Sequence, residues 1–145
     1  MKKILLFLFL AAGMASQAQI RKIPAVVTES FKTKYPGAAN VEWKDKLSAF
    51  VASFDNGSAK FEARFNSKGE WLQTEHGTTE ADLPAPVKDG LSKSKYAEWK
   101  ATSFYIRDLP GNKTQYRIGV EKSDLQKKNL LFSSEGQLLK DSMTL

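Results

Sequence analysis

The chain has 145 residues, of which 41% are hydrophobic and 26% charged, with a formal net charge of +6 and no cysteine. Without cysteine the chain cannot form disulfides, thiolate metal sites or a catalytic thiol, so its fold must be held together by packing. Lysine and arginine are scattered among acidic residues rather than clustered on one segment, so the sequence lacks the pattern of a nucleic-acid-binding protein and we expect no nucleic-acid partner.

The first eighteen residues have the composition of a signal peptide. Two lysines follow Met1, an uncharged apolar stretch runs from Ile4 to Met14, and small residues precede the expected cleavage after Ala18. Cleavage there leaves 127 residues with a net charge of +4. The apolar stretch is shorter than the ~20 residues that a bilayer requires. We therefore expect a periplasmic or secreted protein with no stable membrane anchor.

The remaining sequence repeats itself. Several short motifs occur twice in the same order: Ile23-Pro24-Ala25 and Leu83-Pro84-Ala85, Lys34-Tyr35 and Lys95-Tyr96, and finally Phe65–Gly69 and Phe132–Gly136. Repetition at a fixed period indicates a duplicated structural unit. We predict two tandem units, residues 19–80 and 81–145, joined by a short linker at 78–82.

Each unit is predicted to open with a helix. Pro24 and Pro84 suit the first helical turn, where a missing N–H costs nothing. Apolar residues follow at a spacing of four and form one stripe in the first helix, made of Ile23, Val27, Phe31 and Tyr35. This helix must end before Pro36, and its second copy, which Gly90 weakens by ~1 kcal/mol, is expected to run to Lys95-Tyr96.

Strands follow each helix. Apolar and polar residues alternate over 41–44, 49–54 and 60–65, which indicates strands with one buried and one wetter face. Asn56-Gly57 is typical of a tight hairpin, and a turn at 66–69 leads into a fourth strand at Trp71-Leu72. We predict an α+β fold of two helix-plus-four-stranded antiparallel meander units, with the sheets joined into one continuous eight-stranded sheet and the helices on one face.

The two units differ in length at one place. About five extra residues fall in the first hairpin of the second unit, around Leu109–Lys113. We interpret this segment as an enlarged hairpin and as a second candidate for contacts, since loops on rigid scaffolds often carry function.

The paired Pro-Ala helices ending in Lys-Tyr, each followed by a meander that closes on a Phe-x-x-x-Gly turn, resemble the PepSY-like family, which is similar to beta-lactamase inhibitory protein. The resemblance covers about Ile20 to Leu145. It implies two helix-and-four-strand units whose sheets join into a concave surface that grips a partner enzyme. It does not identify that partner, because the inhibitory protein contains disulfides and this chain has none.

Residues able to carry catalysis are scarce. His76 is the single histidine, and we interpret it as an exposed residue at a strand end. Nucleophilic catalysis needs a nucleophile, a base and an orienting group, and a zinc site needs several His or Cys ligands. We therefore predict no enzymatic activity, no cofactor and no metal site.

The sheet face turned away from the helices is the predicted binding surface. Tyr and Arg are favoured anchors of protein interfaces. The residues predicted to contact a partner are Val51, Arg64, Leu72, Tyr105, Arg107 and Arg117, with Leu131 and Leu139 on the same face. The predicted function is an exported, monomeric, non-enzymatic protein that engages or inhibits a protein or peptide. The alternative is a periplasmic carrier of a small molecule or envelope component, which an enclosed apolar pocket would favour.

Overall fold

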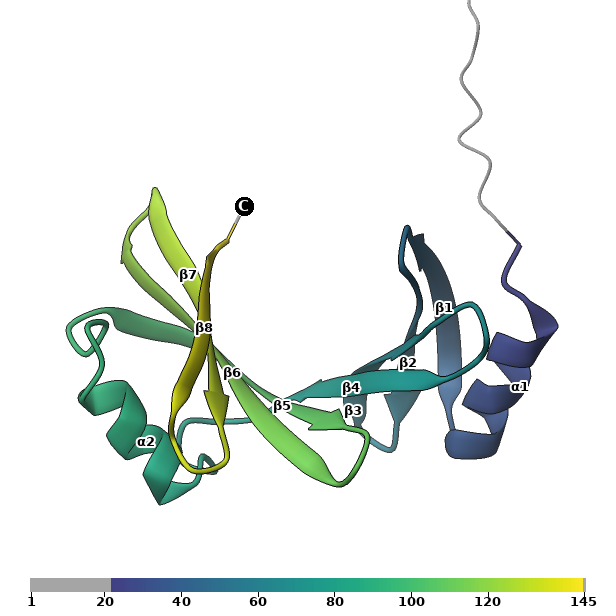
Figure 1. Cartoon of the computed structure of the whole chain (residues 1–145), viewed down its shortest axis with the longest axis horizontal. Coiled ribbons are helices and arrows are strands. Elements are labelled where there is room, and N and C mark those ends of the chain that lie inside the picture. Colours follow the sequence, from purple (N-terminus) through teal and green to yellow (C-terminus); the bar gives the residue numbers. More distant parts are fainter. Residues whose placement is uncertain (1–21, 145) are drawn as a thin grey trace, which may run out of the picture.

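The computed structural model describes residues 22–144, so the expected signal peptide lies outside the described residues. Eight antiparallel strands form one sheet in which each strand pairs with its neighbour in sequence, and two helices complete the α+β fold (Figure 1). The prediction of a single eight-stranded antiparallel sheet with two helices is confirmed. Neither helix of the described residues is long and apolar enough to cross a membrane.

The elements follow the predicted order, with a helix before each set of four strands. Their bounds are α1 Ala25–Lys34, β1 Ala39–Lys46, β2 Ala49–Asn56, β3 Ala59–Phe65, β4 Trp71–Gly77, α2 Ala85–Ser92, β5 Lys100–Leu109, β6 Lys113–Ser123, β7 Gln126–Ser133 and β8 Leu138–Met143.

Strand register places both helices on the same face of the sheet. One row of directly paired residues crosses six strands, and its members are Phe54, Phe61, His76, Ile106, Tyr116 and Phe132. Residues at one end of this row pack in the core beneath α1, and residues at the other end pack in the core beneath α2. Side chains alternate between faces along a strand, so the intervening residues lie on the opposite face, here called the open face.

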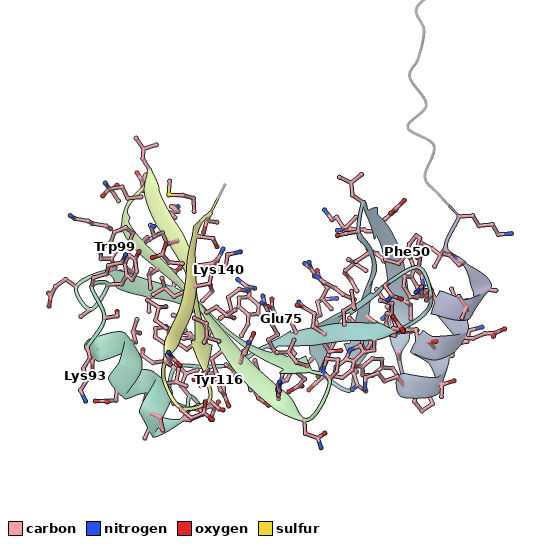
Figure 2. The ribbon with its side chains drawn as sticks, in the orientation of Figure 1. Phe50, Glu75, Lys93, Trp99, Tyr116 and Lys140 are labelled. Carbon is pink, nitrogen blue, oxygen red and sulfur yellow. The ribbon has the colours of Figure 1, made fainter. Side chains whose placement is uncertain are left out.

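The sheet is strongly bent. In Figure 1, β1 to β3 rise on one side and β7 and β8 on the other, with β4, β5 and β6 running between them. The helices lie on the outer side of this bend, so the open face is concave. Figure 2 places Glu75 at the centre of the molecule, between the two arms.

Each helix covers its own hydrophobic core. Under α1, Phe31 packs edge-on against Phe54, with ring centroids 4.9 Å apart, and Val27 is fully buried. Such aromatic pairs contribute about 0.5–1.5 kcal/mol beyond the area they bury. Under α2, Val87 is fully buried beside Phe132. The cores are separate, so the sheet alone joins the halves.

The repeated Lys-Tyr motif anchors the end of each helical segment to the last strand of the same half. The hydroxyl of Tyr35 hydrogen-bonds to the Thr74 hydroxyl on β4. The hydroxyl of Tyr96 donates to Asp141 on β8 at 2.5 Å. This bond, together with Lys128 and Lys95, holds the pKa of Asp141 at about 2. The two halves thus reach the same packing with different acceptors.

One predicted feature of the second half is wrong and another is confirmed. Helix α2 ends at Ser92 rather than at Lys95-Tyr96. The hydroxyl of Ser94 donates to the carbonyl of Leu91, and such local side-chain bonds compete with continuation of a helix. The extra residues near Leu109 lengthen the first hairpin of the second half, as predicted, and they do so through longer β5 and β6 strands, which are joined by a turn of only three residues, 110–112.

Candidate functional site

The open face carries an excess of basic side chains. Strand register assigns ten Lys and Arg residues and five Asp and Glu residues to the open face. The rest of residues 22–144 carries nine Lys and Arg residues and eleven Asp and Glu residues. The basic residues of the open face are Lys44, Lys46, Lys60, Arg64, Lys100, Arg107, Lys113, Arg117, Lys127 and Lys140, and the acidic ones are Glu42, Asp55, Glu62, Glu75 and Glu121.

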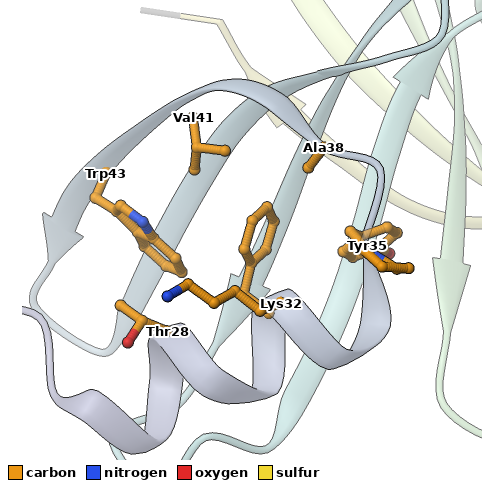
Figure 3. Close-up of a pocket in the computed structure, with 8 residues that line it drawn as sticks. Thr28, Lys32, Tyr35, Ala38, Val41 and Trp43 are labelled. Carbon is orange, nitrogen blue, oxygen red and sulfur yellow. The ribbon is translucent and has the colours of Figure 1, made fainter.

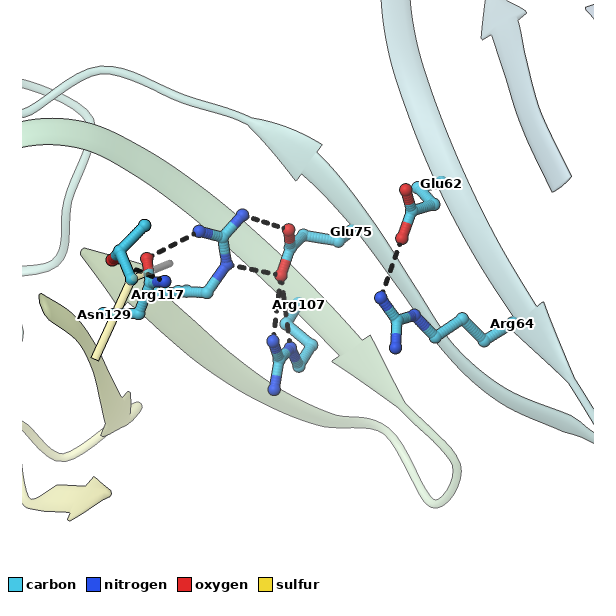
Figure 4. A network of polar contacts seen from close by, with 7 residues as sticks. Glu62, Arg64, Glu75, Arg107, Arg117 and Asn129 are labelled. Carbon is cyan, nitrogen blue, oxygen red and sulfur yellow. Dashed lines mark hydrogen bonds and ion pairs between the residues drawn. The ribbon is translucent and has the colours of Figure 1, made fainter. Parts of the chain in front are cut away.

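An Arg–Glu–Arg cluster forms the floor of this face, where β4 pairs with β5 (Figure 4). Glu75 accepts from Arg107 through Nε at 3.3 Å and Nη2 at 3.0 Å, both on Oε2. Arg117 donates through Nε to Oε2 at 3.0 Å and through Nη2 to Oε1. Bidentate arginine–carboxylate pairs are both stronger and more directional than single contacts. Side chains from β4, β5 and β6 are therefore tied together.

The cluster keeps one positive charge in excess. Burial alone raises the pKa of Glu75, but the hydrogen bonds and charges of Arg117 and Arg107 outweigh burial and lower the pKa below its ordinary value. Glu75 is therefore ionised at neutral pH, and two guanidinium groups share one carboxylate. The side chains of Arg107 and Arg117 are 20% and 22% exposed, so the excess charge is shielded from water but reachable.

Tyr105 and Asn129 hold Arg117 from two further sides. The guanidinium carbon of Arg117 lies 3.9 Å from the centroid of the Tyr105 ring, within the range of a cation–π contact. Arg117 also donates from Nη1 to Asn129 Oδ1 at 3.0 Å. Every guanidinium nitrogen of Arg117 thus has a partner, which fixes this side chain before any ligand arrives.

The predicted contact residues fall into three groups. Tyr105, Arg107 and Arg117 converge on the open face where β5 pairs with β4 and with β6. Arg64 lies on the neighbouring strand, is 44% exposed and pairs with Glu62 at 3.0 Å instead (Figure 4). Register also places Val51 on the open face, but its side chain is 2% exposed and offers a partner no contact area.

The two leucines beside strand turns are exposed at irregular positions. Leu72 is the extra residue of a β-bulge between β3 and β4, and Leu139 has the same position between β7 and β8. They are 39% and 45% exposed. Bulges often redirect a side chain, so neither leucine extends the surface formed by Tyr105, Arg107 and Arg117. Leu131 does extend that surface, because it pairs directly with Arg117 across β6 and β7.

Two residues that accept hydrogen bonds from these arginines, Glu75 and Asn129, were missed by the sequence predictions. Glu75 and Asn129 are ordinary polar residues, and nothing in their local pattern distinguishes them. Their role depends on which strands pair. Glu75 lies opposite Arg107, and Asn129 lies opposite Gly119, which is two residues along β6 from Arg117. The register between β4 and β5, and that between β6 and β7, was the information needed.

His76 lies next to the end of β4, as predicted, but it is not exposed. It is half-buried on the helix-bearing face, where its ring stacks on Phe61 with centroids 4.6 Å apart. Its Nδ1 is buried without a hydrogen-bond partner among the described residues. His76 pairs with Ile106 of the second half, so β5 lies beside it although it is near the end of its strand. Within residues 22–144, no three His, Cys, Asp or Glu side chains gather closely enough to hold a metal ion.

A groove of about 570 Å³ lies between α1 and the edge strand β1 (Figure 3). Its walls are mainly aromatic and apolar, with Phe31, Tyr35 and Trp43 at the base and Val41 on the strand. Val41 is 37% exposed, so the groove is open to solvent along the strand. It is a cleft beside the α1 core rather than an enclosed cavity.

Several solved structures have the same fold. A BLIP-like protein from Bacteroides fragilis is 26% identical, with a TM-score of 0.70 over 83% of this chain and 86% of that one. A protein from Bacteroides eggerthii described among "putative periplasmic proteins" is 24% identical, with a TM-score of 0.74 over 83% and 88%. A DUF2874 family protein from Bacteroides ovatus is 24% identical, with a TM-score of 0.75 over 83% and 87%.

One family model matches residues 48–140, and its description is "Putative beta-lactamase-inhibitor-like, PepSY-like". The match begins just before β2 and ends within β8, so it includes every residue of the cluster. No curated protein matches the chain.

Proposed function

The chain belongs to the PepSY-like family, and from this premise we propose that the mature protein is an exported, non-enzymatic binding protein that engages a protein or peptide through its open face. Export rests on the signal-peptide pattern of residues 1–18 and agrees with the periplasmic description of a protein of the same fold. The two halves act as tandem units whose sheets join at β4 and β5 to make one binding surface.

The observation that carries this proposal is the fixed group of side chains at the floor of the concave face. Tyr105 and Arg117 are held against each other, and Arg117 is bonded through all three guanidinium nitrogens. A surface whose anchors are ordered before binding loses less conformational entropy on association. Tyr and Arg in central, partly desolvated positions are also the residues that most often dominate binding energy.

The partner is an extracytoplasmic protein, and the family description favours an enzyme that the bound protein blocks. The BLIP-like protein of Bacteroides fragilis has the same fold and supports this choice. The carrier alternative receives less support, because the groove beside α1 is open along β1 and would leave a bound apolar molecule in contact with water.

The test is capture of a partner from an envelope extract by mature wild-type protein and by the Tyr105→Ala variant. Loss of a central anchor typically costs about 2 kcal/mol or more, so we expect the apparent Kd for the captured protein to rise at least about thirtyfold. Arg117→Ala should weaken capture as well. Lys68→Ala, an exposed residue in the turn before β4, is the matched control and should leave the Kd unchanged.

Equal capture by wild type and Tyr105→Ala would contradict the proposal, provided that circular dichroism shows both proteins folded. If a small molecule instead co-purifies with the protein and Trp43 fluorescence reports its binding, the carrier function would replace it.

A further inference from the structure

We infer that the partner presents an acidic contact surface and inserts a carboxylate against the Arg–Glu–Arg cluster. This inference rests on the proposed function, because it names the chemistry of the surface that the open face binds. It follows from two separate observations: the charge distribution over the sheet, and the unequal numbers of cations and anions at its floor.

The first observation is the charge asymmetry between the open face and the rest of the described residues. The open face has five more basic than acidic side chains, while the remainder of residues 22–144 has two more acidic than basic ones. Summed surface charge of one sign speeds encounter with a surface of the opposite sign and disfavours partners of the same sign. A concave basic face therefore selects a convex acidic partner.

The second observation is the excess cation at the floor. Both oxygens of Glu75 already accept from arginine N–H groups, and the single negative charge of Glu75 balances only one of the two guanidinium groups. Arg107 uses Nε and Nη2 for Glu75, and within the described residues its Nη1 has no acceptor. A guanidinium carries five N–H donors in a planar fork that fits a carboxylate. A carboxylate from the partner would meet these free donors and balance the cluster at two cations and two anions.

Surrounding residues favour a carboxylate on a protein over the phosphates of a nucleic acid. Single-stranded nucleic acids need a basic track with free aromatic faces for stacking. Here Tyr105 already has Arg117 against its ring, Glu62 separates the two basic residues of β3, and Glu75 lies opposite Glu62 on β4. The floor thus offers isolated positions for carboxylates rather than a continuous path for phosphates.

The test uses mature protein and capped octaglutamate as the probe, with octalysine and an eight-residue oligothymidylate for comparison. Binding is followed by the amide NMR signals of the protein at low salt and at about 0.2 M salt. We expect octaglutamate to shift signals of β4, β5 and β6 around Tyr105 and Arg107, with affinity falling as salt rises. Octalysine should leave the spectrum unchanged.

A charge-reversed pair of variants locates the binding site. Lys140→Glu changes an exposed residue of the open face next to Leu131, and Lys68→Glu makes the same change of charge in the turn before β4. We expect Lys140→Glu to weaken octaglutamate binding at least about threefold, and Lys68→Glu to leave it within error.

Equal weakening by the two variants, or shifts confined to α1 and α2, would overturn the inference. Tighter binding of oligothymidylate than of octaglutamate would overturn it in favour of nucleic acid. If the protein captured through Tyr105 proves to bind with a neutral or basic surface, the acidic-partner inference fails while the proposed function stands.

Discussion

Replacing Gly136 by alanine is expected to lower the free energy of unfolding by about 2–5 kcal/mol. Gly136 has φ +83°, which costs other L-residues about 1–2 kcal/mol. An added Cβ would also lie 1.9 Å from the carbonyl oxygen of Pro86 at the start of α2. Backbone cannot move aside as a flexible side chain can, so α2 must shift from its core, and overpacking of this kind costs typically 1–3 kcal/mol.

Gly57→Ala is the matched control for this prediction. Gly57 also has a positive φ, +64°, but an added Cβ there meets nothing within 4 Å. Urea unfolding followed by circular dichroism should therefore show a loss of about 1 kcal/mol for Gly57→Ala and several times that for Gly136→Ala. Similar losses for the two variants would show that the close approach of the turn to α2 is unimportant.

The same contact explains why α2 contains a poor helix former. A Cβ on Gly90 would lie 2.0 Å from the carbonyl oxygen of Gly136, so the helix and the turn touch through two glycines. In the first half, a Cβ on the turn glycine Gly69 would likewise lie 2.8 Å from the carbonyl oxygen of Val26 and from the hydroxyl of Ser30 on α1. The Phe-x-x-x-Gly motif is therefore a helix-packing motif as well as a turn.

Glu75→Gln is expected to have the second large effect, a loss of about 2–3 kcal/mol in unfolding free energy. The substitution leaves two guanidinium groups close together in a partly buried place with no anion between them. Breaking a buried ion pair costs about 3–5 kcal/mol, and the 13–22% exposure of these side chains reduces that cost through solvent screening.

The loss should also depend on pH. The folded-state pKa of Glu75 lies below its ordinary value of 4.5, so its stabilisation is complete above that pH and disappears as the pH falls through the folded-state pKa. The difference between wild type and Glu75→Gln should thus be full at pH 7 and shrink in acid. Glu62→Gln, which breaks the exposed pair with Arg64, is the control and should cost less than about 1 kcal/mol. A pH-independent difference would contradict this explanation.

Much of the fold could be predicted because its signals are local. Alternation around Phe54 and Phe65 identifies the strands, Asn56-Gly57 identifies the first hairpin, and Pro24 and Pro84 mark the helix starts. The end of α2 was predicted wrongly, because the repeated Lys-Tyr motif does not reveal the local bond from the Ser94 hydroxyl to the Leu91 carbonyl that accompanies the end of the helix.

The candidate site was predicted in part for the same reason. Alternation places Tyr105 and Arg117 on one face, but it does not reveal that Glu75, on a strand of the other half, lies between two arginines. Nor does it reveal that Val51, on the same face, is covered by its neighbours. The charge excess of the open face could be counted only when all eight strands had been placed in register.

Site-specific photo-crosslinking in the envelope tests the binding face most directly. A photoreactive amino acid is placed at Lys140 on the open face in one variant and at Lys68 on the helix-bearing side in another. The proposed function predicts that irradiation joins the Lys140 variant, but not the Lys68 variant, to one protein, and that adding Tyr105→Ala abolishes the adduct. An adduct formed from Lys68 alone, or one that Tyr105→Ala leaves undiminished, would contradict it.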